Sequence, residues 1–100
     1  MAGTVEELTV NYEENGQLLV KELDKVILTK GAWATVLFRF QEWSEADQDY
    51  RAEKYVIRRY RKMNGEYRVQ SKFVISSPDQ ARKIVEVLGA WIDEAAPARP

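Results

Sequence analysis

The stretch KYVIRRYRKMNGEYRVQSKFVIS, residues 54–76, decides the fold. It contains two runs rich in β-branched and aromatic residues on either side of Asn64-Gly65, a dipeptide that favours a two-residue hairpin turn. A turn at this point also fixes the register of the hairpin. The expected cross-strand pairs are Met63 with Glu66, Arg61 with Arg68, Arg59 with Gln70, and Ile57 with Lys72.

This register divides the hairpin into a core side and a basic side, because cross-strand partners share a face. The core side is expected to hold Val56, Tyr60, Tyr67, Val69 and Phe73. The other side is expected to hold Tyr55, Arg59, Arg61, Arg68, Gln70 and Lys72, and this set is too polar to form a core. Arg58 does not fit the division. It would point inward opposite Ser71, which predicts a bulge, a sheet rim or a buried ion pair there.

Further strands precede the hairpin. Residues 33–43, WATVLFRFQEW, alternate strictly, with Ala34, Val36, Phe38 and Phe40 on one face and Trp33, Thr35, Leu37, Arg39, Gln41 and Trp43 on the other. Nearer the N-terminus, Asn15-Gly16 predicts a hairpin turn between a strand at 8–12 and a β-prone stretch at 17–29. Residues 44–53 lack apolar periodicity and predict an exposed acidic loop.

One amphipathic helix closes the chain. Ser77 suits the N-cap, Pro78 the first helical position, and Gln80 completes a capping-box pattern. The apolar stripe that follows is expected to pack on the sheet, and Val87 and Ala90 widen it enough to suggest a second contact surface. The stripe comprises Ala81, Ile84, Val85, Leu88, Trp91 and Ile92. The sequence therefore predicts one α+β domain over residues 8–95, between a flexible segment 1–7 and a disordered tail 96–100.

The composition limits the chemistry. Histidine and cysteine are both absent, and these residues dominate acid–base, nucleophilic and transition-metal catalysis near neutral pH. We expect no enzyme, no cofactor and no metal site. The acidic alternation Glu45, Asp47, Asp49 and Glu53 lacks the glycine and terminal glutamate of a calcium loop, so we interpret it as solvated. No apolar run is long enough to cross a bilayer, and we expect a cytoplasmic protein.

The charges are strongly segregated although the net charge is only -1. Residues 1–53 carry a balance of -6, whereas residues 54–72 carry +6. Proteins bind single-stranded nucleic acid by combining a cationic track for phosphates with flat side chains on which bases stack. The basic side of the sheet offers both, so we interpret it as a nucleic-acid surface, against the alternative that its charges only solubilise the sheet or pair with the acidic loop. The candidate residues are Trp33, Arg39, Trp43, Tyr55, Arg59, Arg61, Arg68 and Lys72.

The phrases ILTKGAWATVLFRF and KYVIRRYRKMNGEYRVQSKFVISSPDQARKIVEVL resemble the positive-cofactor-four family of transcriptional coactivators and its bacterial relatives, over about residues 25–92. The resemblance implies a curved antiparallel sheet followed by one helix, the ββββα arrangement, here with an additional N-terminal hairpin at 8–23. It implies a homodimer that pairs through its helices, with Val87, Leu88 and Trp91 at the interface, and single-stranded DNA bound across the concave faces of the sheets.

The resemblance favours a bacterial-type, largely sequence-independent binder in transcription, recombination or repair, associated with the nucleoid. RNA is a possible second ligand, because the residues do not distinguish it from DNA. The alternative hypothesis is a pleckstrin-like barrel, which also ends in one helix and would present the basic hairpin to anionic lipid or an acidic protein.

Overall fold

The structure of the protein, a computed structural model, describes residues 3–95; the predicted tail 96–100 lies outside the described residues, as do residues 1 and 2. A short 3-10 helix, η1, is followed by six strands and one long helix. Their bounds are η1 Val5–Glu7, β1 Tyr12–Glu14, β2 Gln17–Thr29, β3 Trp33–Ser44, β4 Asp49–Tyr50, β5 Lys54–Met63, β6 Glu66–Ile75 and α1 Pro78–Ala95.

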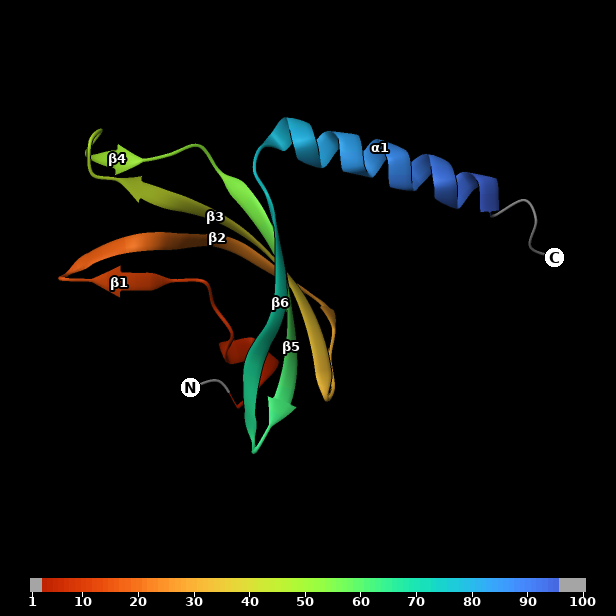
Figure 1. Ribbon diagram of the computed structural model, residues 1–100, viewed down its shortest axis with the longest axis horizontal. Helices are drawn as coiled ribbons and strands as arrows, with labels where there is room; N and C mark the ends of the chain where they lie inside the picture. The colour runs from red at the N-terminus through yellow and green to blue at the C-terminus, as the bar shows by residue number, and fades with distance from the viewer. Residues whose placement is uncertain (1–2, 96–100) are drawn as a thin grey trace.

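The strands form one antiparallel sheet in the order β1-β2-β3-β5-β6, and β4 pairs with the end of β3. The sheet is strongly curled, and α1 follows its edge strand β6 (Figure 1). This arrangement confirms the predicted α+β fold of an antiparallel sheet closed by one C-terminal helix. Since β1 and β6 form the two ends of the strand order, the sheet is open and does not match a pleckstrin-like barrel.

Strand β3 supplies the centre of the core, as its alternation predicts. Ala34, Val36 and Phe38 are fully buried and Phe40 nearly so. They share the buried face of the sheet with Val56 and Tyr60 of β5. Each large side chain buried there contributes roughly 1.5–3 kcal/mol. We call this the inner face, and the opposite one the outer face.

The β5–β6 hairpin turns at Asn64-Gly65 as predicted, with φ values of 52° and 79° at the two residues. The expected pairs Met63–Glu66 and Arg61–Arg68 are present. The register then shifts by one residue, so that the pairs predicted for Arg59 and Ile57 are wrong. The observed partners beyond the shift are Tyr60 with Val69, Arg59 with Ser71, Arg58 with Lys72 and Ile57 with Phe73.

The shift is a β-bulge with Gln70 as the additional residue of β6, which is one of the three outcomes that the inward-pointing Arg58 predicted. A single additional residue reverses the faces of the strand beyond it. Lys72 therefore lies on the inner face beside Arg58, and Phe73 lies on the outer face and is 55% exposed. The sequence analysis placed both residues on the wrong sides.

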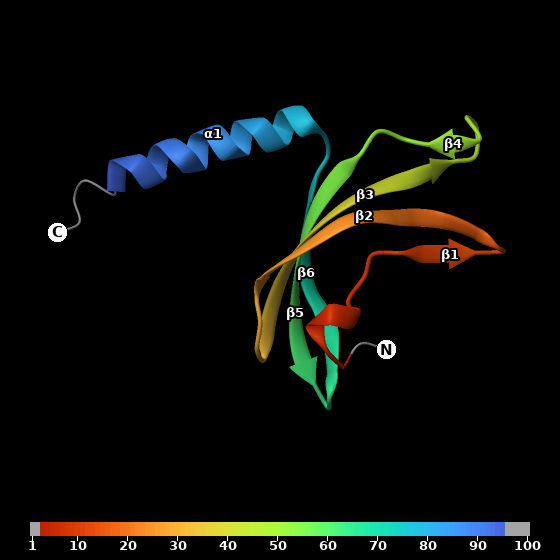
Figure 2. The same cartoon turned by 180° about the vertical axis from the view of Figure 1, so that it is seen from behind.

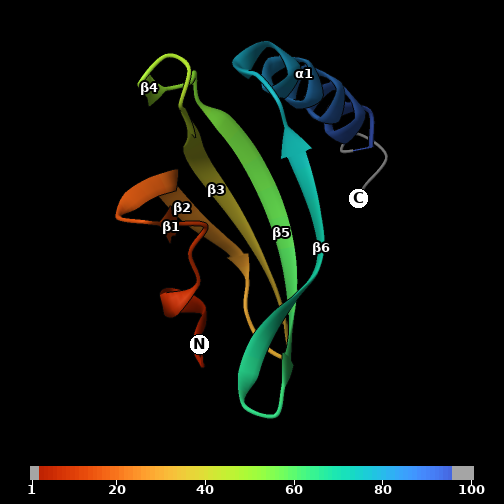
Figure 3. The same cartoon turned by 60° about the vertical axis from the view of Figure 1, so that its left-hand side comes forward.

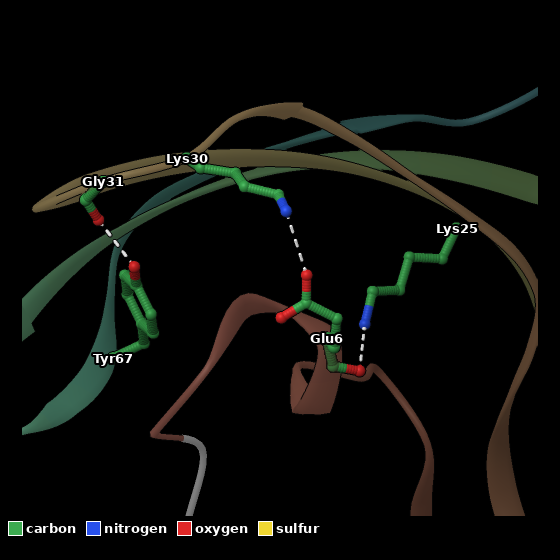
Figure 4. Close-up of polar contacts among 5 residues, drawn as sticks. All are labelled: Glu6, Lys25, Lys30, Gly31 and Tyr67. Atoms are coloured by element: carbon green, nitrogen blue, oxygen red, sulfur yellow. Dashed lines mark hydrogen bonds and ion pairs between the residues drawn. The ribbon is translucent and has the colours of Figure 1, made fainter.

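The N-terminal segment differs from the predicted strand at 8–12. Strand β1 begins only at Tyr12, whereas Leu8 and Val10 pack as an irregular segment on the inner face, together with Val5 from η1. Polar contacts hold this segment: the Lys25 ammonium donates to the Glu6 carbonyl, and Lys30 pairs with the Glu6 carboxylate at 3.1 Å (Figure 4). Lys25 also donates to the Leu8 carbonyl. Residues 3–11 thus cover part of the inner face, and we call them the N-terminal cover.

Helix α1 begins as predicted. The Ser77 hydroxyl accepts a hydrogen bond from the Gln80 amide, and the Gln80 side chain accepts one from the Ser76 amide. The predicted packing of its stripe on the sheet is wrong for most of the helix, because Val85, Trp91 and Ile92 are 68%, 63% and 65% exposed. Two residues, Ser76 and Ser77, separate β6 from α1, and α1 projects away from the sheet (Figure 1 and Figure 3).

Within residues 3–95, no helix has both the length and the apolar composition that crossing a bilayer requires.

Candidate nucleic-acid interface

Four of the predicted binding residues meet at one end of the outer face. Trp33 on β3 pairs with Arg61 on β5, which pairs in turn with Arg68 on β6, and Arg59 lies two residues along β5 on the same face. All four side chains are exposed. We call Trp33, Arg59, Arg61 and Arg68 the arginine cluster.

The indole of Trp33 organises the cluster. The Arg59 guanidinium carbon lies 4.4 Å from the centroid of the indole ring, and that of Arg61 lies 5.4 Å from it. These are cation–π distances, so the ring holds two guanidinium groups near each other without neutralising their charge. Within residues 3–95, neither arginine pairs with a carboxylate. Arg68 has a loose contact with Glu66 at 3.5 Å. The cluster therefore presents concentrated positive charge beside an aromatic ring.

Arg39 and Tyr55 are cross-strand neighbours further along the outer face, where both contact one acidic residue, Glu53. The Glu53 carboxylate lies 3.8 Å from Arg39 and accepts a 2.7 Å hydrogen bond from the Tyr55 hydroxyl, which raises the pKa of Tyr55. A phosphate would have to displace Glu53 before it could reach Arg39. These two residues are on the predicted face but are less available than the arginine cluster.

Trp43 lies at the far end of β3 from the cluster and is partly buried. Its ring meets Tyr50 of β4 edge-on at 5.1 Å, and its indole nitrogen donates to Glu45. Because its ring and its nitrogen already contact Tyr50 and Glu45, Trp43 mainly stabilises the β3–β4 corner. It is less available than Trp33 for binding a ligand.

Lys72 does not join these residues. The bulge places it on the inner face, so seven of the eight predicted binding residues share the outer face and one does not. The curl adds a second difference. The N-terminal cover lies in the inner angle of the sheet, so the arginine cluster is on the convex side, whereas the family resemblance implies the concave one (Figure 1 and Figure 2).

The residues expected at a dimer interface lie together on α1. Val87, Leu88 and Trp91 line a shallow apolar groove with Ile84, and Leu88 is 49% exposed. No segment of residues 3–95 covers this groove.

Comparison with known proteins gives no relative. No protein-family model, no curated protein and no solved structure matches the chain. Within residues 3–95, no three Asp or Glu side chains are grouped so that they could hold a metal ion.

The pair Arg58 and Lys72 was missed by sequence reasoning, although the inward-pointing Arg58 was recognised as an anomaly. Both residues line a hollow on the inner face, between the N-terminal cover and β6. The pair could have been predicted from the bulge that Arg58 suggested. A one-residue bulge between residues 59 and 72 places Lys72 on the same face as Arg58.

Proposed function

We propose that the protein is a non-enzymatic, dimeric binder of single-stranded DNA that contacts its ligand through the arginine cluster. The observation that carries the proposal is the meeting of Trp33 with three exposed arginines on one side of the sheet. Phosphates find three guanidinium groups there with little or no carboxylate pairing, and bases find planar guanidinium groups, held beside the Trp33 ring, on which to stack. Arg39 and Tyr55 extend the surface once Glu53 is displaced.

The arginine cluster suits a single strand of DNA, because bases must be unpaired before they can stack on exposed side chains. It has no groove-reading element that would recognise particular bases. Its contacts are charge and stacking, which every base and phosphate can satisfy, so the binding is largely independent of sequence. The resemblance to the positive-cofactor-four family supports the same ligand, and it also supports pairing of two chains through α1, whose apolar groove is uncovered. Roles in transcription, recombination or repair in a nucleoid follow from that resemblance.

Fluorescence titration with single-stranded and duplex oligonucleotides tests the proposal. We expect the single strand to quench tryptophan fluorescence and its affinity to fall with salt, with a log–log slope of about -0.7 for each phosphate neutralised. Arg61→Glu with Arg68→Glu should reduce binding at least about hundredfold, since two attractive contacts become repulsive. The matched control, Arg51→Glu with Arg82→Glu, makes the same change in charge at exposed positions outside the cluster.

Equal binding by the cluster variant and the control would refute the role of the arginine cluster. Anionic liposomes sedimented with the protein in parallel address the lipid alternative: binding to vesicles with no affinity for oligonucleotides would replace the proposed function with that of a lipid-surface module.

A further inference from the structure

A hollow of about 410 Å³ opens on the inner face, on the opposite side of the sheet from the arginine cluster. The N-terminal cover and the start of β1 form one wall, and β5 and β6 form the other. This volume lies in the range of sites that take one small molecule. The wall at residues 9–12 bounds the hollow, so it suits a compact ligand more than a continuous strand of nucleic acid.

Arg58 and Lys72 bring two positive charges to the hollow. They are direct cross-strand partners, an arrangement of like charges that destabilises a sheet unless an anion offsets it. Neither forms an ion pair within residues 3–95, and the nearby Glu42 carboxylate is held by Lys54 at 2.8 Å. The Arg58 Nε is buried without a hydrogen-bond partner among the described residues. The neighbouring Tyr60 hydroxyl is also buried without a hydrogen bond of acceptable geometry, so it does not satisfy Arg58, and a buried charged donor of this kind needs an acceptor.

The rest of the lining is largely apolar. Val20, Phe40, Val56 and Val74 line the hollow beside the two cations, and Thr9 and Asn11 add polar groups from the N-terminal cover. A bare inorganic anion would satisfy Arg58 and Lys72 but leave the apolar surface in contact with water. The lining therefore matches a ligand with one anionic group and an apolar or aromatic body.

We propose that this hollow is a binding site for a small organic anion, a phosphate or carboxylate attached to an apolar or aromatic body, held by Arg58 and Lys72. The site is separate from the proposed DNA surface, because Arg58 and Arg59 are consecutive residues of β5 that face opposite sides of the sheet. These two arginines form a matched pair for testing it.

Phenyl phosphate and phenylacetate serve as probes of the two anion classes, with benzyl alcohol as the neutral comparator, in NMR titrations of ¹⁵N-labelled protein. We expect saturable shifts of the amide signals of residues 58 and 72 with one or both anions and none with benzyl alcohol. Arg58→Gln and Lys72→Gln should each lower the affinity for the anion at least about tenfold, whereas Arg59→Gln should leave that affinity unchanged. Lys72 is exposed, so its substitution should not disturb folding. Circular dichroism checks that each variant folds, and Lys72→Gln provides the test if Arg58→Gln does not.

Three results would overturn the site: no saturable binding of either anion, equal binding of benzyl alcohol, or loss of anion binding in Arg59→Gln. An oligonucleotide that displaces the anion and depends on Arg58 instead of Arg59 would also overturn it, by showing that the hollow belongs to the DNA surface. If the protein binds the anion but no oligonucleotide, the proposed DNA function is refuted and the proposed anion site is not. The two proposals are therefore refuted by different results.

Discussion

Two tyrosine hydroxyls on the inner face differ in their hydrogen bonding. Tyr67 donates to the Gly31 carbonyl at 2.6 Å and ties the tip of the β5–β6 hairpin to the β2–β3 turn (Figure 4). Tyr60 is 2% exposed, and its hydroxyl has no hydrogen-bond partner among the described residues. Burial raises the pKa of Tyr60, and the neighbouring Arg58 partly opposes that shift. The two hydroxyls should therefore affect stability in opposite directions.

We expect Tyr60→Phe to leave the free energy of unfolding unchanged or to raise it by up to about 1 kcal/mol, because it removes an unsatisfied polar group and keeps the ring. Tyr67→Phe should lower it by about 1 kcal/mol, because a hydrogen bond is lost and the Gly31 carbonyl gains no new partner from the protein. Urea denaturation of the two variants measures both changes. A clear loss of stability in Tyr60→Phe would mean that its hydroxyl does have a partner in solution.

Individual site residues were predictable where alternation alone decides the face. Trp33, Arg39 and Arg61 are on the predicted face because β3 and β5 keep a regular pleat over their paired length. The partner of each site residue was not predictable. Pairing of Glu53 with Arg39 depends on how the β4–β5 connection folds back, and no local pattern encodes that contact.

The bulge at Gln70 is the element-scale feature that positions the two proposed sites. It divides β6 into residues 66–69, which continue the turn register, and residues 71–75, which are displaced by one. Without it, Lys72 would share a face with Arg59, and Ile75, which is buried, would turn to the other side of the sheet. In the displaced register Ile75 lies on the outer face opposite Tyr55, outside the core cluster of the inner face.

Deletion of Gln70 tests this assignment. Since Gln70 is the additional residue, its removal should restore a continuous ladder with all the observed pairs, and we expect a change in the free energy of unfolding below about 1 kcal/mol. Deletion of Phe73 is the control, because it should shift Ile75 out of its buried position at a cost of about 1.5–3 kcal/mol. Thermal and urea denaturation give both values. Equal destabilisation by the two deletions would contradict a bulge at Gln70.

Helices and strands were predictable where a strong local signal starts or ends them. They were less predictable where packing against distant parts of the molecule determines the conformation. The Asn-Gly turns and the Ser77-Pro78 helix start are local, and the structure confirms them. Residues 8–12 alternate as a strand would, but Leu8 and Val10 bury equally well as an irregular segment lying on the sheet. The stripe on α1 predicts an apolar face without specifying which surface covers it.

At the scale of the whole molecule, the protein is thin and elongated, with extents of 57 × 38 × 17 Å. Its one sheet is covered in part on the inner face, and α1 extends from it with an uncovered apolar groove. Most of the stability of an amphipathic helix comes from packing of its apolar face, and here that face has no partner within residues 3–95. This is the structural support for the proposed dimer.

Leu88→Glu should convert the proposed dimer to a monomer, because it places a charge at the centre of the groove. We expect the dissociation constant of the dimer to rise at least about hundredfold, as measured by sedimentation equilibrium. Glu86→Gln is the control, since two residues along a helix place its side chain on nearly the opposite side from Leu88. A wild-type protein that sediments as a monomer at high concentration would exclude the dimer.

The open antiparallel sheet with one final helix could be predicted from the sequence, whereas the curl and the N-terminal cover could not. Both depend on contacts between distant residues: Val5, Leu8 and Val10 pack against a face built from residues 34–60. A pattern along the chain records that these residues are apolar, but the surface they meet exists only after the strands have paired.

The long sequence separation between the N-terminal cover and the face it packs on also affects the order of folding. The N-terminal cover is synthesised before the strands on which it packs, and its docking surface is complete only when β5 has been synthesised and paired with β3. Contacts of such long sequence separation form after local hairpins, because they close larger loops. Residues of the N-terminal cover, although made before these strands, are therefore among the last of the domain to reach their final positions, and in the interval the inner face is open.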